Sequence, residues 1–173
     1  MSHLILVLNP GSTSTKAAVY QDEQPVCSTS ILHTNQDLAP FPALTDQLDY
    51  RVSLVRKWLE EESFDLTTLS AVVGRGGIIP NIVAGGYQVD DALVDCLLHH
   101  TVFDHASNLG GLMARAFAAP LGIPAYIYDA VTSDELLPEA RVTGFKEVTR
   151  TSFCHVLNAR ATAHKYAEAL GRK

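Results

Sequence analysis

Residues 4–20 read LILVLNPGSTSTKAAVY, an apolar run that enters a hydroxyl-rich turn and leaves it as a second, alternating run. The first run, Leu4–Leu8, is typical of a buried strand, and the alternation of Ala17–Tyr20 predicts a second strand. Between them, Gly11 permits a tight reversal of the chain. The Ser and Thr hydroxyls and the backbone N–H groups can hold a phosphate, and Lys16 adds a positive charge. The stretch therefore predicts two strands joined either by a phosphate-binding turn or by an ordinary hairpin turn.

The turn does not have the pattern of a Walker-type phosphate loop. Such a loop has a glycine directly before its lysine and a helix after it. Here Thr15 precedes Lys16, and the residues that follow alternate as in a strand.

Length and composition are those of one ordinary domain. The chain has 173 residues, of which 47% are hydrophobic, so it can bury a substantial core. Its net charge of -6 argues against a broad nucleic-acid-binding surface. Cys27, Cys96 and Cys154 are odd in number and lack CxxC spacing, so we expect free packing residues in a reducing compartment. The apolar run 4–8 is too short for a membrane span and lacks a signal-peptide pattern, so we expect a cytoplasmic protein.

Five strands and four helices are predicted along the chain. The predicted strands are Leu4–Leu8, Lys16–Tyr20, Pro25–Leu32, Ala71–Val73 and Ala125–Tyr128. The predicted helices are Leu44–Glu62, Asp90–His99, Asn108–Ala118 and Ala159–Leu170. A meander of three antiparallel strands followed by alternating helices and strands favours an α/β domain, with a five-stranded mixed sheet and helices on both faces. The Gly- and Pro-rich stretch 74–86 is expected to be a loop near the site.

Two clusters place a basic or imidazole side chain in a turn. Arg75 lies in a Gly-Arg-Gly-Gly sequence after the strand at 71–73, where its guanidinium can clamp an anion. The alternative is a Gly-rich turn with an exposed Arg. His105 precedes Ser107, which we expect to cap the helix that begins near Asn108. A helix N-terminus favours anions, although a His in such a turn is more often a surface residue.

Two further candidates follow later elements. Asp129 comes directly after the apolar strand 125–128, where its carboxylate can hold Mg²⁺ or serve as a helix or turn cap. His155 opens the last helical stretch. Asn9, Arg75 and Asp129 each lie at or just past the end of an apolar strand, where ligands of open α/β sheets gather. A Lys, an Arg, a His and a carboxylate around a phosphate-binding turn suit phosphoryl transfer, which depends on positioning and charge neutralisation.

Five motifs, taken in order, resemble those of butyrate kinases, in the acetate kinase group of the actin-like ATPase superfamily, whose domains have the ribonuclease H-like fold. They are Leu8–Lys16, Gly74–Gly77 with Gly85–Tyr87, His105–Gly110, Ala125–Asp129 and Ser152–His155. The resemblance covers essentially the whole chain. Acetate kinases proper resemble it less, because they have a longer Arg-containing segment and His-Asn-Pro in place of the His-Ala-Ser at 105–107. This difference favours butyrate or a branched short-chain acid over acetate.

The resemblance implies a role for each matching residue of the turn. The residues implied to bind the cofactor's phosphates are Asn9, Ser12, Ser14 and Lys16. Asn9 and Asp129 are implied to face Mg²⁺. We also expect phosphate or sulfate to bind in the turn at 9–16 or near Arg75.

The resemblance also implies four catalytic residues, which are Arg75, His105, Asp129 and His155. Arg75 would grip the carboxylate or the phosphoryl group in transfer, and His155 would stabilise the charge of that group. Asp129 would orient or activate the acyl substrate. A general base is hardly needed, since a short-chain carboxylate is already ionised at neutral pH.

By the resemblance, residues 1–173 form the N-terminal, acyl-substrate- and phosphate-binding domain of a two-domain kinase that converts ATP and butyrate, or a branched homologue, to ADP and an acyl phosphate. The C-terminal ATP domain is absent, so the chain alone is expected to turn over little or nothing. The alternatives are a non-catalytic ligand-binding or regulatory module of the same fold, and an acetate or propionate kinase domain. Expected partners are the carboxylate, the acyl phosphate and the absent domain, with a homo-oligomer for the full-length protein and neither nucleic acid nor a membrane.

Overall fold

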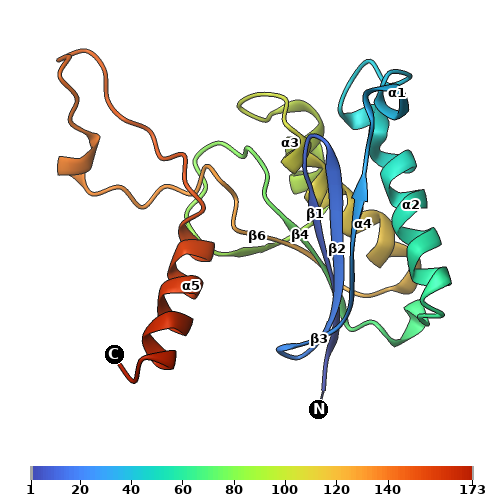
Figure 1. Ribbon diagram of the computed structural model, residues 1–173. Helices are drawn as coiled ribbons and strands as arrows, with labels where there is room; N and C mark the ends of the chain where they lie inside the picture. The colour runs from blue at the N-terminus through green and yellow to red at the C-terminus, as the bar shows by residue number, and fades with distance from the viewer. Residues whose placement is uncertain (1, 173) are drawn as a thin grey trace.

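A six-stranded sheet in the order β3-β2-β1-β4-β6-β5 forms the centre of the protein, whose computed structural model describes residues 2–172 (Figure 1). The strands are β1 (Leu4–Pro10), β2 (Ser14–Gln21), β3 (Gln24–Leu32), β4 (Ala71–Arg75), β5 (Gly86–Gln88) and β6 (Ala125–Tyr128). β1, β2 and β3 are antiparallel neighbours, as predicted. β4 is parallel to β1, β6 is parallel to β4, and β5 is antiparallel to β6. The predicted α/β domain with a mixed sheet is confirmed.

The predicted number of five strands is wrong, because β5 was not foreseen. It begins at Gly86, the last residue of the Gly- and Pro-rich stretch 74–86, and its three residues are too few to show an alternating pattern. The strand forms through a tertiary contact, in which Tyr87 pairs with Ile127 of β6 and packs against the core.

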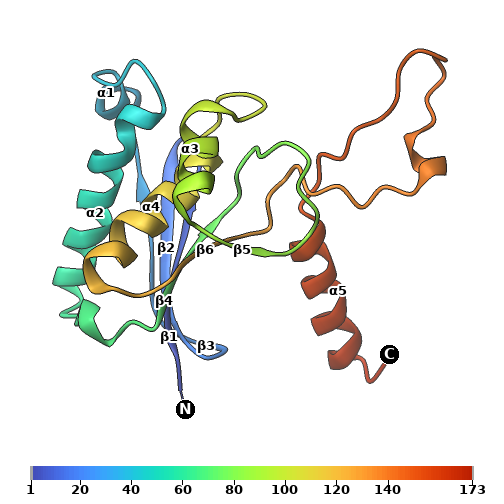
Figure 2. The same cartoon turned by 180° about the vertical axis from the view of Figure 1, so that it is seen from behind.

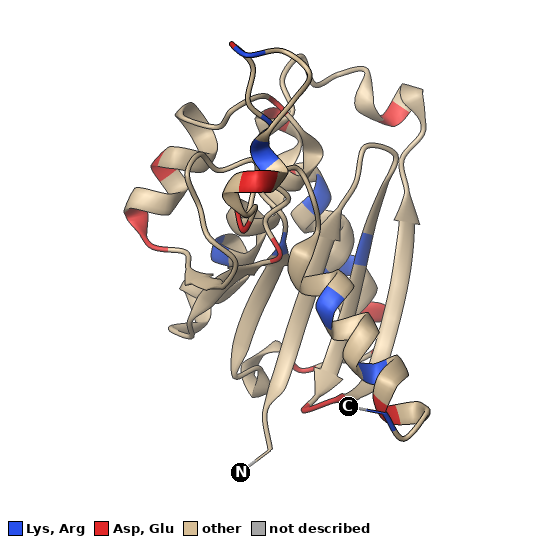
Figure 3. Cartoon of the chain, turned by 90° about the vertical axis from the view of Figure 1, so that its left-hand side faces the viewer, with Lys and Arg blue, Asp and Glu red and all other residues tan. Residues whose placement is uncertain are grey.

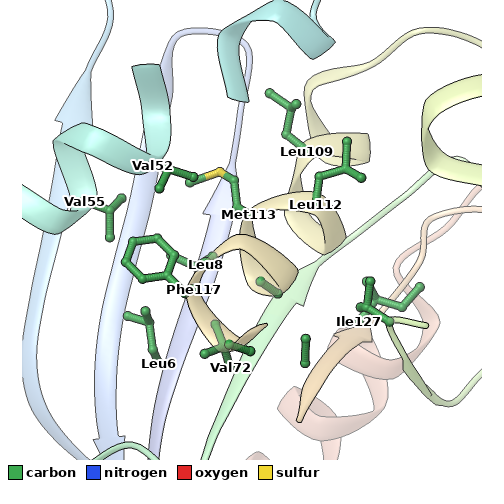
Figure 4. Close-up of a cluster of buried hydrophobic side chains, with 14 of the residues drawn as sticks. Leu6, Leu8, Val52, Val55, Val72, Leu109, Leu112, Met113, Phe117 and Ile127 are labelled. Atoms are coloured by element: carbon green, nitrogen blue, oxygen red, sulfur yellow. The ribbon is translucent and has the colours of Figure 1, made fainter. Parts of the chain in front are cut away.

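The α-helices of the described chain are α1 (Asn35–Leu38), α2 (Leu48–Glu61), α3 (Asp91–His99), α4 (Leu109–Ala118) and α5 (Val156–Ala169). Two of them, α2 and α4, pack on one face of the sheet. Leu6 and Leu8 of β1 and Val72 of β4 point from alternate positions toward Met113 and Phe117 of α4 (Figure 4). Val52 and Val55 of α2 lie beside them (Figure 4). Figure 2 shows α2, α3 and α4 together and α5 apart from them.

Two glycines allow α4 to lie directly on the end of β4. A Cβ atom on Gly74 would lie 2.0 Å from the carbonyl oxygen of Gly110, and a Cβ on Gly110 would lie 2.5 Å from the carbonyl oxygen of Arg75. Real Cβ atoms do not approach backbone this closely, so both positions require glycine. This contact fixes the backbone of Arg75 against the start of α4.

The second face of the sheet is covered only in part. Val7 of β1, Val73 of β4 and Tyr126 of β6 line a cavity of about 520 Å³, to which α5 contributes Leu157 and Ala161. α5 therefore lies on the face opposite α2 and α4, and helices flank both faces as predicted. Figure 3 shows both signs of charge along α5 and the segments around it. Among residues 2–172, no helix combines the length and apolar character that crossing a bilayer requires.

Candidate active site

Three candidate residues lie at one edge of the sheet. β1, β4 and β6 are parallel neighbours, so their carboxyl ends meet at the same edge. Asn9 lies near the end of β1, Arg75 is the last residue of β4, and Asp129 directly follows β6. Ligands of open α/β sheets bind outside this kind of edge.

Asp129 is the centre of a tight polar cluster. Its Oδ2 accepts hydrogen bonds from Nε (3.2 Å) and Nη2 (3.1 Å) of Arg75, and it lies 2.9 Å from Nδ1 of His155. Its Oδ1 accepts the backbone N–H of Asn158 at 3.2 Å. Asp129 is only 3% exposed, and a buried carboxylate requires partners of this kind. The carboxylate thus holds Arg75 and His155 side by side.

The backbone around the cluster explains how His155 returns to it. After Asp129 the chain makes a long excursion away from the sheet (orange in Figure 1) before it enters α5. The Ser152 hydroxyl donates to the carbonyl of Ser133 at 2.6 Å, and the N–H of Cys154 donates to the carbonyl of Val131 at 2.8 Å. His155 follows as the N-cap residue of α5.

His105 lies in a short turn just before α4. Its Nδ1 accepts the backbone N–H of Ser107 at 3.2 Å and lies 2.8 Å from the Ser107 hydroxyl. The predicted capping of the helix by Ser107 is wrong, because a 3₁₀ turn at Ala106–Asn108 precedes α4 and moves its N-cap to Asn108. The Asn108 side chain instead accepts the backbone N–H of Ile78 at 2.8 Å.

Two phenylalanines connect the turn of His105 with the segment of His155. The ring of Phe103 lies 6.3 Å from the ring of His105 and stacks on Phe153 with a centroid distance of 5.7 Å. Phe103 is 44% and Phe153 is 58% exposed. The structure therefore brings the predicted histidines to the same region by an aromatic contact between two loops.

The turn between β1 and β2 presents its polar side chains in two directions. The N–H of Gly11 donates to the carbonyl of Ser14 at 2.7 Å and closes the turn. Asn9 is the cross-strand partner of Lys16. Lys16 and Ser12 are exposed, whereas Thr15 is fully buried on the side of α2. The exposed side of the turn is therefore the side on which an anion can bind.

The described residues do not present a group of free carboxylate oxygens that could bind a cation. Both carboxylate oxygens of Asp129 are already engaged by Arg75, His155 and the N–H of Asn158. Within residues 2–172, no three His, Cys, Asp or Glu side chains are grouped to hold a metal ion. Mg²⁺ usually takes one or two carboxylates, with water and substrate phosphates as its other ligands. Asp129 would have to release a cationic or imidazole partner to become one of them, and we assign no step to a metal here.

The sequence did not indicate Arg51 and His33. Arg51 of α2 is fully buried, and its Nη1 donates to the carbonyl of Gly11 and to Oγ1 of Thr15, both at 2.9 Å. Thr15 Oγ1 in turn lies 2.8 Å from Nε2 of His33, which is 4% exposed. A signal for Arg51 was present, since it lies within the apolar stripe of α2, three residues after Leu48.

The geometry indicates that His33 is neutral. Thr15 Oγ1 accepts from Arg51, which can only donate, so the Thr15 hydroxyl proton is free to be donated to Nε2 of His33. Burial and the charge of Arg51 lower the pKa of His33 below its ordinary 6.5, and Asp37 opposes them. The Tyr50 hydroxyl lies 3.4 Å from Nδ1.

We expect His33 to lower the unfolding free energy of the chain in acid. Because the pKa of His33 is lower in the folded chain than in the unfolded one, its contribution is fully present above about pH 6.5 and is lost as the pH falls toward the folded-state pKa. Urea unfolding at pH 7.5 and 5.5 should show a fall in unfolding free energy that is smaller in His33→Gln. The control is His164→Gln on the exposed surface of α5, and equal pH slopes for wild type and His33→Gln would contradict the assignment.

The cysteines differ in their environments. Cys27 and Cys96 are half-buried against the core, where burial raises the pKa of each thiol. Cys154 is exposed, so the predicted packing role is wrong for this residue. It directly precedes His155, the N-cap residue of α5.

No protein-family model matches the chain. A probable butyrate kinase of Clostridium botulinum is 41% identical over 172 residues, which are 99% of this chain and 48% of that protein. Butyrate kinase 1 of Clostridium acetobutylicum is 37% identical over 169 residues, covering 98% and 48%. The crystal structure of Porphyromonas gingivalis acetate kinase matches with a TM-score of 0.65 at 14% identity, over 99% of this chain and 50% of that one, which shows a shared fold.

The chain spans about half the length of the curated relatives it matches. The matched segments cover 98% to 99% of this chain. Over almost its whole length, this chain is similar to proteins named butyrate kinases.

Proposed function

We propose that the chain is the acyl-substrate- and phosphate-binding half of a cytoplasmic carboxylate kinase. The whole enzyme would convert ATP and butyrate, or a branched short-chain acid, to ADP and an acyl phosphate. The observation that carries this proposal is the cluster in which the buried Asp129 holds Arg75 and His155 at the edge where Asn9 also lies. The identity to proteins named butyrate kinases supports it.

Arg75 would neutralise the reacting anions. Phosphoryl transfer to a carboxylate brings two negative groups together, so catalysis depends on positive charge placed between them. Nε and Nη2 of Arg75 are engaged by Asp129, but the side chain is still 32% exposed. Its remaining N–H groups can donate to the substrate carboxylate or to the phosphoryl group.

His155 would act through its other ring nitrogen. Nδ1 faces Asp129 and so carries a proton. Nε2 is left for the phosphoryl oxygens, and the side chain is 39% exposed. His105, on the other side of the Phe103–Phe153 pair, would face the same region. The residues of the turn that would bind nucleotide phosphates are Asn9, Ser12, Ser14 and Lys16, with Asn9 able to face the Mg²⁺ that accompanies ATP.

A chimera tests the proposal. The chain is fused to the C-terminal half of the Clostridium botulinum relative, and acyl phosphate is trapped with hydroxylamine for acetate, propionate, butyrate and isobutyrate. We expect product with ATP, with the highest kcat/KM for butyrate or isobutyrate, and none from the chain alone. A folded chimera that binds ATP but forms no acyl phosphate would contradict the proposal and favour a non-catalytic module. A maximum at acetate or propionate would correct the substrate.

A further inference from the structure

We propose that Arg51 is a positioning residue. It binds the buried side of the turn at 9–16 and thereby orients the opposite, exposed side, where an anion binds. The inference rests on the proposed assignment of that turn to phosphate. Nη1 of Arg51 donates to the carbonyl of Gly11 at 2.9 Å and to Oγ1 of Thr15 at 2.9 Å, with the Ser14 carbonyl at 3.4 Å. One buried side chain of α2 thus binds three residues of the turn, at both of its ends.

The contact to Gly11 sets the direction of a neighbouring donor. The carbonyl of Gly11 and the N–H of Ser12 belong to one planar trans peptide, so they point in opposite directions. Since the Gly11 oxygen points to Arg51, the N–H of Ser12 points away from it. Ser12 is exposed whereas Arg51 is fully buried, so this N–H is directed to the side of the turn that solvent and ligands reach.

Arg51 also places a positive charge behind the turn without a counter-ion. Gln47 Oε1 accepts from Nε at 3.1 Å and from Nη2 at 2.9 Å, so the acceptors found for the guanidinium are neutral oxygens. No carboxylate within residues 2–172 forms an ion pair with it. A buried charge that lacks an opposite charge is costly, and an anion bound in front of the turn would lower that cost. Arg51 and a bound phosphate therefore stabilise each other.

The test measures binding of inorganic phosphate to the chain by NMR. In ¹⁵N-labelled wild type, the amide of Ser12 reports the turn and the Nε–H of Arg51 reports the guanidinium. Arg51→Gln removes both the positive charge and the planar guanidinium with its several N–H donors. Arg51→Lys keeps the charge but not the guanidinium. The matched control is Arg56→Gln, because Arg56 is also on α2 and donates to a backbone carbonyl, that of Ala116 at 3.2 Å, away from the turn.

We expect phosphate to shift the Ser12 amide and the Arg51 Nε–H of the wild type with the same midpoint. Arg51→Gln should weaken binding at least about tenfold. Arg51→Lys should fall between it and wild type, and Arg56→Gln should bind as wild type does. This partial recovery by Lys is not expected of a residue that only packs.

Each other outcome overturns a distinct statement. If folded Arg51→Gln binds phosphate as tightly as wild type, the positioning role is wrong and the assignment of the turn stands. If wild type binds phosphate without a shift at Ser12, the assignment of the turn fails, and this inference fails with it. If both Arg51 variants unfold, the wild-type titration decides alone, and an unmoved Arg51 resonance beside a moving Ser12 amide overturns the role.

Discussion

Arg75→Ala, introduced into an active protein that contains this chain, is expected to lower kcat by at least about a hundredfold, which is the usual effect of removing a group that stabilises transition-state charge. The variant loses the guanidinium that lies between the buried Asp129 and the open edge of the sheet. His155→Ala should have an effect of similar size, because it removes the neighbouring imidazole. Steady-state kinetics of acyl phosphate formation measure both.

The control for Arg75 removes an ion pair elsewhere. Arg115→Ala breaks the pair of Arg115 with Asp91 at 3.0 Å, which shares no hydrogen bond or ion pair with Arg75, Asp129 or His155, and should leave kcat near wild type. Arg75→Lys keeps the charge but loses the two-nitrogen contact, so its kcat should be intermediate. Near-normal kcat in folded Arg75→Ala and His155→Ala would mean that the reaction occurs elsewhere.

Gly110→Ala is expected to lower the unfolding free energy by about 3 kcal/mol or more, at the upper end of the usual cost of overpacking. The new methyl group would lie 2.5 Å from the carbonyl oxygen of Arg75, and backbone cannot move aside as a flexible side chain does. Denaturant unfolding followed by circular dichroism measures the change. Because α4 would be pushed off the end of β4, kcat should fall as well.

A second glycine provides the matched control for this variant. A Cβ on Gly144 would meet no heavy atom within 4 Å, so Gly144→Ala should change the unfolding free energy by no more than about 0.5 kcal/mol. An unchanged denaturation midpoint in Gly110→Ala would show that α4 does not rest on β4 as described.

Local patterns were enough to predict most of the fold. The alternation in residues 16–20 and the helical spacing of Val52, Val55 and Leu59 each depend on neighbours within a few residues. β5 has three residues, and it exists because Tyr87 meets Ile127, which lies far from it in the sequence. No local pattern encodes a contact of that kind.

The site was predicted as a set of positions but not as a set of contacts. Strand ends indicated that Asn9, Arg75 and Asp129 share an edge, and the parallel pairing of their strands places them there. The binding of Asp129 to Arg75 joins residues 54 positions apart, and the sequence offered a metal for this carboxylate instead. On the structure, Asp129→Asn would first loosen Arg75 and His155.

Arg51 shows a second reason why side-chain roles were missed. Its partners in the turn lie 36 to 40 positions away, and on a helix a lone Arg among apolar residues is usually a side chain whose head reaches water. Only the packing of α2 against the turn shows that this head is buried.

Asp129 has a backbone conformation that is unfavourable for a residue with a side chain, although its carboxylate forms the contacts of the cluster. Asp22, Ser63, Asn81 and Asp129 are the non-glycine residues of the described chain with positive φ, at 52°, 54°, 53° and 60°. Such a backbone costs free energy that glycine would not incur. Exchange of Ser63 or Asn81 for glycine would therefore remove this strain and is expected to raise the unfolding free energy. The same exchange at Asp129 would relax the main chain but would remove the carboxylate that binds Arg75, His155 and the N–H of Asn158, so at this position the strained backbone is kept together with the contacts that it allows.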